Sequence, residues 1–365
     1  MTAQLDVVKL GVRGFRNLSQ VEIEPGPRFN IISGDNGQGK TSLLEAIYFV
    51  CTSKSFRSEK LTDLKQFGAP FAVVAAELRE AGLMRRQRAA LSDGGRELII
   101  DDKSPARLAD YAVRSPIVVF QPGDLQLISG SASGRRKLLD RVGLFLSPSS
   151  LDHRQRFQRA QRERQRLLET RGPQAAELAG YERVMARHGA ELERVRLLAA
   201  ERLTEAAARA FESLADSRLR AKLKFIPGGP FEEEELSRQL VMTRNDDQRR
   251  HSTRIGPHKD ELEIALDHKL ARRHASQGQQ RVLALALKIA ELECLRQARG
   301  VFPLLLLDDV SSELDHARTQ AVYDFLGTNL CQIFLTTTRP ELFNPKGSNA
   351  SDRRDFRLEQ GAVLA

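Results

Sequence analysis

Apolar residues near the start of the chain alternate with polar ones, as they do in β-strands. Short segments of this kind cover residues 5–12, 21–23 and 28–33, with turn-forming residues between them. After Thr41 the spacing changes to the three- and four-residue period of a helix. The apolar residues with this period are Leu43, Leu44, Ala46, Ile47 and Val50. The pattern therefore predicts a strand that leads through a glycine-rich loop into a helix.

β-like alternation returns between about residues 70 and 120. It is clearest in segments 71–78, 96–101 and 116–120, and Gly94-Gly95 stands where a hairpin turn would be. These segments predict further strands.

The character of the chain then becomes helical. From residue 135 to 216 there is little glycine or proline, and Gly172-Pro173 divides this stretch into two predicted helices. Residues 246–365 return to alternating strands and helices. We therefore predict an α/β core built from residues 1–133 and 246–365, with an α-helical subdomain inserted at 134–245.

Composition is that of a soluble globular protein long enough for two domains. The chain has 365 residues, 41% hydrophobic and 29% charged, and no apolar run approaches the ~18 residues of a membrane span. The first residues lack the features of a secretory signal, which predicts a cytosolic protein without a membrane partner. Cys51, Cys294 and Cys331 are widely spaced and form no CxxC pair, so we expect reduced, buried thiols.

Net charge adds a hint about partners. Lysine and arginine outnumber aspartate and glutamate by 57 to 48, which gives a formal net charge of +9. A basic balance favours polyanions, because neutralising phosphates releases condensed counterions. Charge alone leaves DNA, RNA and an acidic membrane open.

One segment matches the phosphate-binding loop G-x-x-x-x-G-K-[ST]. It consists of Gly34, Asp35, Asn36, Gly37, Gln38, Gly39, Lys40 and Thr41. Its glycines let backbone N–H groups point at phosphate oxygens, Lys40 would reach the β- and γ-phosphates, and Thr41 would place its hydroxyl on Mg²⁺. A chance match in a chain of this length is on the order of one in a hundred.

A second motif stands far downstream. Four leucines at 304–307 predict a buried parallel strand that ends in Asp308 and Asp309. Asp308 would help to hold Mg²⁺, and Asp309 would orient or deprotonate the attacking water. A strand that merely ends in acidic turn residues is the alternative, and the phosphate loop favours the functional interpretation.

Most of the chain separates Lys40 from Asp308, which suits an ATPase head with an inserted arm. Ser276, Gly278 and Gln279 precede a predicted helix and resemble the S-x-G-Q signature motif of ABC-type ATPases. That resemblance implies that the serine meets the γ-phosphate of a nucleotide held by the opposite subunit. Ser276 and Gln279 also fit an ordinary capping box, and the two interpretations are compatible.

Three further positions fit the same class. Segment 312–315 (Ser-Glu-Leu-Asp) resembles its D-loop, and Gln121 is a candidate for the residue that senses Mg²⁺ and water. A surface glutamine before Pro122 is an equally good explanation of Gln121. Thr336-Thr337-Thr338 stands where many ABC proteins have a switch histidine, and threonine does not titrate near neutral pH, so we expect slow hydrolysis that relies on Asp309.

Several stretches together resemble the RecF family of bacterial recombination and repair ATPases, from the first strand to about residue 340. They are Phe15-Arg16-Asn17, Lys54-Ser55-Phe56-Arg57, Pro122-Gly123-Asp124-Leu125, Gly130, Arg135-Arg136, Gly256-Pro257-His258-Lys259-Asp260, Ser276-Gln277-Gly278-Gln279-Gln280-Arg281 and Leu307-Asp308-Asp309. The chain departs from the family pattern at Lys259, where arginine is usual, and at Gly123, where an acidic residue is usual.

The resemblance implies an ABC-type P-loop ATPase head with mixed β-sheets around the phosphate-loop helix and an inserted helical arm (lobe II). It also implies that Arg16, Asn17 and Ser42 contribute to the nucleotide site, and that the protein binds ATP with Mg²⁺ and dimerises around it. A weak DNA-stimulated ATPase would then act at single-strand gaps or duplex/single-strand junctions, with RecR and RecO, to promote RecA loading. Its place would be the cytoplasm, at the nucleoid.

The first half of the predicted arm is rich in arginine. Arg159, Arg162 and Arg166 fall on one helical face, which could contact DNA phosphates without reading bases. A solvated helix with internal pairs, such as Glu163 with Arg159, is the alternative.

Two other functions remain open from the sequence. A transporter's nucleotide-binding subunit would use the same head, but the basic arm argues against it. A chromosome-maintenance scaffold would bridge distant duplexes, and an arm of about a hundred residues is short for that role.

Overall fold

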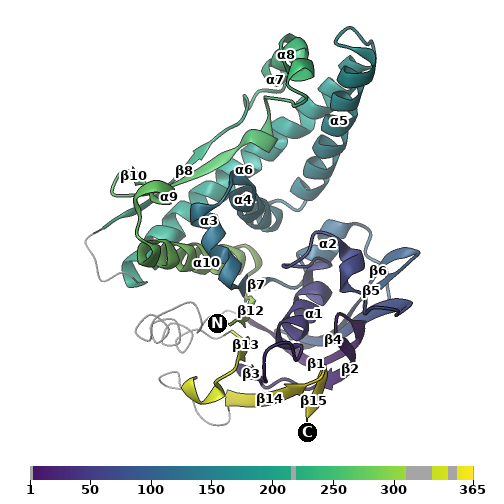
Figure 1. The fold of residues 1–365 in the computed structure, drawn as a ribbon, viewed down its shortest axis with the longest axis vertical. Coiled ribbons are helices and arrows are strands. Elements are labelled where there is room, and N and C mark those ends of the chain that lie inside the picture. Colours follow the sequence, from purple (N-terminus) through teal and green to yellow (C-terminus); the bar gives the residue numbers. More distant parts are fainter. Residues whose placement is uncertain (1–2, 215–218, 310–330, 344–351, 365) are drawn as a thin grey trace. The chain divides into compact units, whose positions relative to one another are not determined.

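The computed structural model describes residues 3–214, 219–309, 331–343 and 352–364 (Figure 1). The chain divides into two compact units, one made of residues 1–124 and 295–365 and the other of residues 125–294. The discontinuous first unit contains both the phosphate loop and the aspartate pair. The second unit is larger than the arm expected at 134–245, because it extends to residue 294 and includes strands as well as helices.

The first unit contains a six-stranded sheet. Its strands are β3 (Phe29–Ser33), β7 (Ile117–Phe120), β12 (Leu304–Asp308), β13 (Ile333–Thr337), β14 (Arg353–Glu359) and β15 (Ala362–Leu364). Their order is β15-β14-β3-β13-β12-β7, and all neighbours run parallel except β14 and β15. Strands β7, β12 and β13 are buried along their whole length, which accounts for their continuous apolar runs.

A second sheet in this unit is mainly antiparallel. Its strands are β1 (Ala3–Phe15), β2 (Leu18–Ile23), β4 (Phe71–Glu80), β5 (Leu83–Ser92), β6 (Gly95–Ile100) and β11 (Val301–Phe302). The order is β11-β1-β4-β5-β6, and β2 also pairs with β1. The sequence did not single out β5, since arginines and a glutamine occupy its positions 85–88.

Helix α1 (Lys40–Thr52) shares one apolar core with both sheets of the first unit. Leu10 of β1, Ile47 of α1 and Leu306 of β12 belong to this core. The remaining elements of the unit are short: η1 (Leu61–Leu64), α2 (Leu108–Ala112), η2 (Pro122–Leu125) and η4 (Pro340–Leu342). The strand–loop–helix order around the phosphate loop is thus confirmed.

The second unit combines a helical hairpin with a small sheet. Its helices are α3 (Gln126–Ser129), α4 (Ala132–Leu146), α5 (Ser150–Arg171), α6 (Leu178–Leu214), α7 (Glu233–Met242), α8 (Arg244–Arg249), η3 (Pro257–Lys259), α9 (Ala271–His274) and α10 (Gln277–Arg299), which ends in the first unit. Its strands are β8 (Ala221–Ile226), β9 (Glu261–Leu266) and β10 (Lys269–Leu270), in the antiparallel order β10-β9-β8. The break predicted at Gly172-Pro173 separates α5 from α6.

The hairpin of α5 and α6 is held by a buried arginine as well as by apolar contacts. Arg164 is fully buried and donates to Glu182 at 3.0 Å, to Asp247 at 2.8 Å and to the carbonyl oxygen of Leu240 at 2.7 Å. It therefore joins α5 to α6, α7 and α8. The arginine-rich first half of the predicted arm includes Arg164, and the structure gives this residue a role in packing.

The expectation of buried thiols without disulfides is confirmed. All three cysteines are buried and free, and burial raises the pKa of the Cys294 thiol to about 12. No helix within the described ranges is long and apolar enough to cross a bilayer.

Replacing Arg164 with methionine should destabilise the protein by about 3–5 kcal/mol, because it leaves the buried carboxylates of Glu182 and Asp247 without their shared cation. Urea unfolding followed by circular dichroism measures the loss. Arg166→Met is the matched control, since Arg166 is exposed on the same helix and its ion pair with Glu163 lies at the surface. Equal stability of the two variants would contradict the role given to Arg164.

Candidate nucleotide-binding site

The phosphate loop lies between the end of β3 and the start of α1, and two of its glycines are required by geometry. Gly34 has φ 147°, and a Cβ there would lie 2.4 Å from the carbonyl oxygen of Leu358. Gly39 has φ 107°, and a Cβ there would lie 2.9 Å from the side chain of Leu18. Only glycine fits both the backbone and the space at these positions.

Residues close to the end of β14 brace the loop from outside. The backbone N–H of Gly361 donates to the carbonyl oxygen of Gln38 at 3.1 Å, and that of Gln360 donates to the Gln38 side chain at 2.5 Å. A Cβ at Gly361 would lie 2.1 Å from the carbonyl oxygen of Asn17, so this contact is also tight. Nothing in the sequence pattern had indicated this support.

Lys40 lies across the loop that it follows. Its ammonium group donates to the carbonyl oxygens of Gly34 at 2.7 Å and Asp35 at 2.8 Å. Burial lowers the pKa of Lys40, and the carboxylates of Asp309, Asp35 and Asp308 act in the opposite direction. The positive charge of Lys40 thus lies beside the backbone N–H groups of the loop, where it would pair with the phosphates of a bound polyphosphate.

The parallel register brings the ends of four strands to one edge of the sheet. Leu307 of β12 pairs with Phe120 of β7, so Gln121 and Asp308 follow at adjacent backbone positions. Asp308 pairs in turn with Thr336 of β13, and Thr337 pairs with Ser33 just before the phosphate loop. Open α/β sheets bind ligands at this edge.

Asp308 is the point where the two motifs meet. Its Oδ1 accepts hydrogen bonds from the hydroxyls of Thr41 and Thr336, each at 2.8 Å. Burial raises the pKa of Asp308, while these two hydrogen bonds lower it. An oxygen pair of Thr41 and Asp308 is a donor set that Mg²⁺ favours.

Thr336 also fixes the neighbouring aspartate. Its Oγ1 accepts the backbone N–H of Asp309 at 3.0 Å, and Asp309 has a left-handed backbone with φ 49°. Such a conformation is costly for a residue other than glycine and recurs at functional sites. The sequence placed the threonines where many ABC proteins have a switch histidine, and in the structure the buried Thr336 bonds both members of the aspartate pair.

A cluster beside the loop was only partly anticipated. Arg16 donates to both carboxylate oxygens of the buried Glu45, at 2.9 and 2.8 Å, and Glu45 also lies 3.5 Å from Arg57. The charge of Arg57 helps to lower the pKa of Asp308. The sequence quoted Arg57 only within a family motif, and its position between Glu45 and Asp308 needed the fold.

The other predicted nucleotide contacts occupy varied positions. Asn17 donates to the carbonyl oxygen of Gly37 at 3.2 Å, Ser42 is buried in α1, and Asp35 to Gly37 lie exposed in the loop. Gln121 is half-buried, and its backbone N–H donates to Asp124 at 2.9 Å. Their contacts with nucleotide remain predictions.

The signature segment belongs to the second unit, where it forms the capping box. The backbone N–H of Ser276 donates to Gln279 Oε1 at 2.8 Å, and that of Gln279 donates to Ser276 Oγ at 3.2 Å. Ser276 is exposed at the start of α10, and Gly278 is half-buried. The predicted D-loop at 312–315 lies outside the described residues.

The arginine face predicted on α5 is present, with a different pairing. Arg159, Arg162 and Arg166 are all exposed. Glu163 pairs with Arg166 at 3.1 Å, so the pair suggested with Arg159 is wrong. Within the part of the chain that the structure describes, Arg159 and Arg162 form no ion pair.

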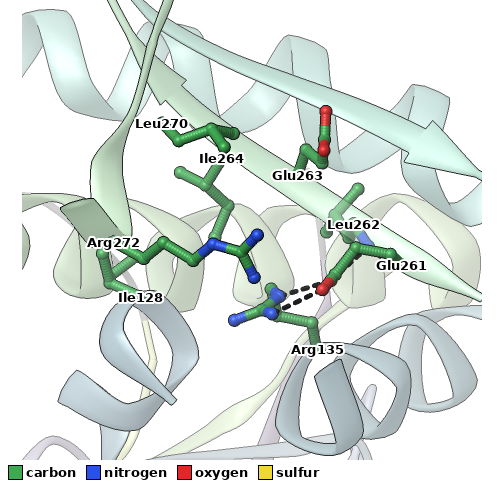
Figure 2. Close-up of a pocket in the computed structure, with 8 residues that line it drawn as sticks. All are labelled: Ile128, Arg135, Glu261, Leu262, Glu263, Ile264, Leu270 and Arg272. Atoms are coloured by element: carbon green, nitrogen blue, oxygen red, sulfur yellow. Dashed lines mark hydrogen bonds and ion pairs between the residues drawn. The ribbon is translucent and has the colours of Figure 1, made fainter. Parts of the chain in front are cut away.

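A small cavity in the second unit is unrelated to nucleotide. Figure 2 shows Arg135 and Glu261 at its wall, joined by two hydrogen bonds of 2.6 and 2.7 Å, with Arg272 beside them. Its volume of about 10 Å³ has room for roughly one water molecule. The family-motif residue Arg135 therefore serves this unit's internal structure.

Comparisons with known proteins agree with this geometry. The family model described as "RecF/RecN/SMC N terminal domain" matches residues 6–352. The chain is 39% identical to the DNA replication and repair protein RecF of Anaeromyxobacter sp. (strain Fw109-5), with 98% of this chain and 99% of that protein covered. It is 37% identical to the RecF of Myxococcus xanthus (strain DK1622), over 98% of this chain and 96% of that one.

Solved structures give the same result. A structure described as the recombination mediator protein RecF-ATP in the RecFOR pathway has a TM-score of 0.87 at 27% identity, over 99% of this chain and 98% of that one. An Smc head bound to the C-winged helix domain of ScpA shares the fold, with a TM-score of 0.56 at 18% identity over 98% and 95%.

The fold and the site define an ABC-type P-loop ATPase head of the kind found in RecF, RecN and SMC proteins. Within that class, the chain belongs to the RecF family of DNA replication and repair proteins.

Replacing Thr336 with valine should raise the Mg²⁺ concentration needed for nucleotide binding by about 10- to 100-fold, because Asp308 loses the hydrogen bond that orients it. Titration of Mg²⁺ against a fluorescent ATP analogue measures the shift. Thr338→Val, at an exposed position two residues on, should leave the titration unchanged. An unaltered Mg²⁺ dependence in Thr336→Val would show that this hydroxyl does not position the site.

Proposed function

We propose that this chain is an ATP-dependent DNA-binding protein of recombinational repair, in which ATP holds two protomers together around DNA. The observation that carries the proposal is the convergence of Thr41 and Thr336 on Asp308 beside the phosphate loop. It gives the site the parts that a triphosphate with Mg²⁺ requires. Relatives described as RecF-ATP structures support ATP as the nucleotide.

Each side chain of the head has a role in this proposal. Thr41 and Asp308 hold Mg²⁺, which neutralises charge on the β- and γ-phosphates when bound. Lys40 moves from the loop carbonyl oxygens to the phosphates, since ammonium pairs more strongly with an anion than with a neutral acceptor. Asp309 orients the attacking water, and Gln121 senses Mg²⁺ and water from the next strand.

Hydrolysis is slow in this proposal, and serves to end the ATP-bound state. Thr336 stands where a titrating switch residue would be expected, and its hydroxyl already bonds Asp308 and the N–H of Asp309. Asp309 is then the group that activates water. ATP turnover is stimulated when DNA is bound.

Dimerisation uses the exposed start of α10. The capping box keeps this helix start well formed, with Ser276 in solvent. A helix N-terminus attracts anions, so Ser276, Gly278 and Gln279 of one protomer can meet the γ-phosphate held by the other. Two ATP molecules are thereby shared between two chains.

DNA is the polyanionic partner in this proposal, with gaps and duplex/single-strand junctions as its site of action at the nucleoid. The names of the relatives, a DNA replication and repair protein and a member of the RecFOR pathway, support it. RecO and RecR are the proposed protein partners, and RecA loading is the outcome.

Ser276→Arg tests the shared site, because a bulky cation at the helix start would exclude the partner's nucleotide. Wild type should be a monomer without ATP and a dimer with ATP, whereas Ser276→Arg should bind ATP within about twofold of wild type and stay monomeric. Size exclusion with light scattering gives the mass, and a fluorescent ATP analogue gives the affinity.

Ser149→Arg is the control for this experiment, since Ser149 is another exposed serine at a helix start in the same unit. It should dimerise like wild type. ATP-dependent dimerisation of Ser276→Arg would refute the shared site, and an oligomeric state independent of ATP in wild type would refute the gating mechanism.

The arm face is proposed to contact DNA phosphates. Replacing Arg159 and Arg162 together with glutamine should weaken binding to all sequences alike and reduce the salt slope by about 2, one for each lost phosphate contact. Fluorescence anisotropy over a series of salt concentrations measures both. Arg156→Gln is the control, because Arg156 pairs with Asp152 on the same helix. A salt slope equal to that of wild type would exclude this face from the interface.

A further inference from the structure

The most exposed large apolar side chain among the described residues is Phe67, in the loop between η1 and β4. Its relative exposure is 104%. Leaving a phenylalanine in water forgoes about 1.5–3 kcal/mol of burial. One exposed ring alone needs no explanation, whereas exposed rings grouped with other apolar surface mark interaction sites.

The loop that carries Phe67 is held in place on both sides of the ring. The backbone N–H of Gln66 donates to the carbonyl oxygen of Gly14 at 2.9 Å, and the Gln66 side chain donates to Ser19 at 2.9 Å. On the other side, the N–H of Ala69 donates to the carbonyl oxygen of Gln66 at 2.9 Å. The ring is therefore presented on a fixed support, which lowers the entropy lost on binding.

The loop that carries Phe67 is hydrogen-bonded to the end of β1 and leads into β4, whose open face carries a second aromatic ring. Phe71, with 36% exposure, begins β4, and the guanidinium of Arg13 lies 5.6 Å from its ring centre. Arg13 pairs with Val73 across the sheet, so Arg13, Val73 and Phe71 share one face. Next to them, a Cβ added at Gly11 would meet no atom within 4 Å, so no side chain covers the sheet face at that position.

Further along the same face the charges are already matched. Lys9 pairs with Glu22, Arg88 with Glu97 and Arg86 with Glu77. Cations that already form ion pairs contribute little to binding the phosphates of a duplex, because that binding depends on cations without a carboxylate partner. At the aromatic end the groups offered are Phe71, Arg13 and Gln20, which pairs with Arg13 between β1 and β2, and Phe67 stands in the loop that leads into β4.

We infer that Phe67, Phe71 and Arg13 form a stacking platform for the unpaired bases of a DNA strand. Aromatic rings on the face of an antiparallel sheet, with an arginine beside them, hold single strands by stacking in other nucleic-acid proteins. Bases inside a duplex have no free face to offer such rings. This inference rests on the proposed function. It adds a contact site for the single-stranded part of a junction to the proposed contacts with duplex DNA.

The chain contains no tryptophan, which allows a direct test. Phe67→Trp places the sole tryptophan on the platform, and its fluorescence should be quenched by gapped DNA or oligo(dT) and not by a blunt duplex. In the same assay conditions, with ATP, Phe67→Ala should bind gapped DNA about 5- to 100-fold more weakly than wild type. Its affinity for a blunt duplex should stay within twofold.

Leu83→Ala is the matched control. Leu83 is 75% exposed at the hairpin between β4 and β5, at the other end of the same sheet, and its loss should leave all DNA affinities unchanged. Thermal melting of each full-length variant should match wild type, since neither side chain is buried.

Two results would overturn the platform. If Phe67→Ala binds gapped DNA like wild type and Phe67→Trp shows no quenching, the ring does not contact bases. If Phe67→Ala instead loses binding to a protein, Phe67 belongs to a protein interface. Equal weakening for duplex and gapped DNA would also contradict base stacking. Failure of wild type itself to bind DNA with ATP would instead refute the proposed function, and the platform with it.

Discussion

The nucleotide site depends on one buried carboxylate. Asp308 receives hydroxyl groups from Thr41 and Thr336, which come from segments almost 300 residues apart in sequence. A carboxylate buried without such donors would cost several kcal/mol. The hydrogen bonds to Asp308 therefore stabilise the sheet register that brings β12, β13 and the phosphate loop together. The same hydrogen bonds that stabilise the fold set the positions of Thr41, Asp308 and Asp309.

Much of the head was predictable because its signals are local. The phosphate loop, the leucine strand before Asp308 and the glycine–proline break in the arm each lie within a short stretch whose residue types specify its backbone. Arg164 and Arg159 show the limit of such reasoning. They lie on one helix and are the same residue type, and only the packing of α6, α7 and α8 shows that one is buried while the other faces water.

Long-range contacts account for what the sequence did not reveal. Thr336 was predicted to stand where a switch histidine is usual, and its hydrogen bond to Asp308 depends on the pairing of β12 with β13. Arg57 was quoted only as part of a family stretch and Phe67 in no motif, so neither residue was predicted to have a role of its own. Propensity and periodicity describe neighbours in the chain, whereas these roles arise between elements.

The brace on the phosphate loop has a consequence for protein synthesis. Gly34 lies so close to the backbone of Leu358 that no side chain would fit there, and Gln38 accepts hydrogen bonds from the backbone of Gln360 and Gly361. During synthesis the loop motif is complete at Thr41, yet the residues that brace it follow more than 300 positions later, in β14 and the turn after it. A polypeptide whose synthesis stops before residue 353 would therefore possess the motif without its brace.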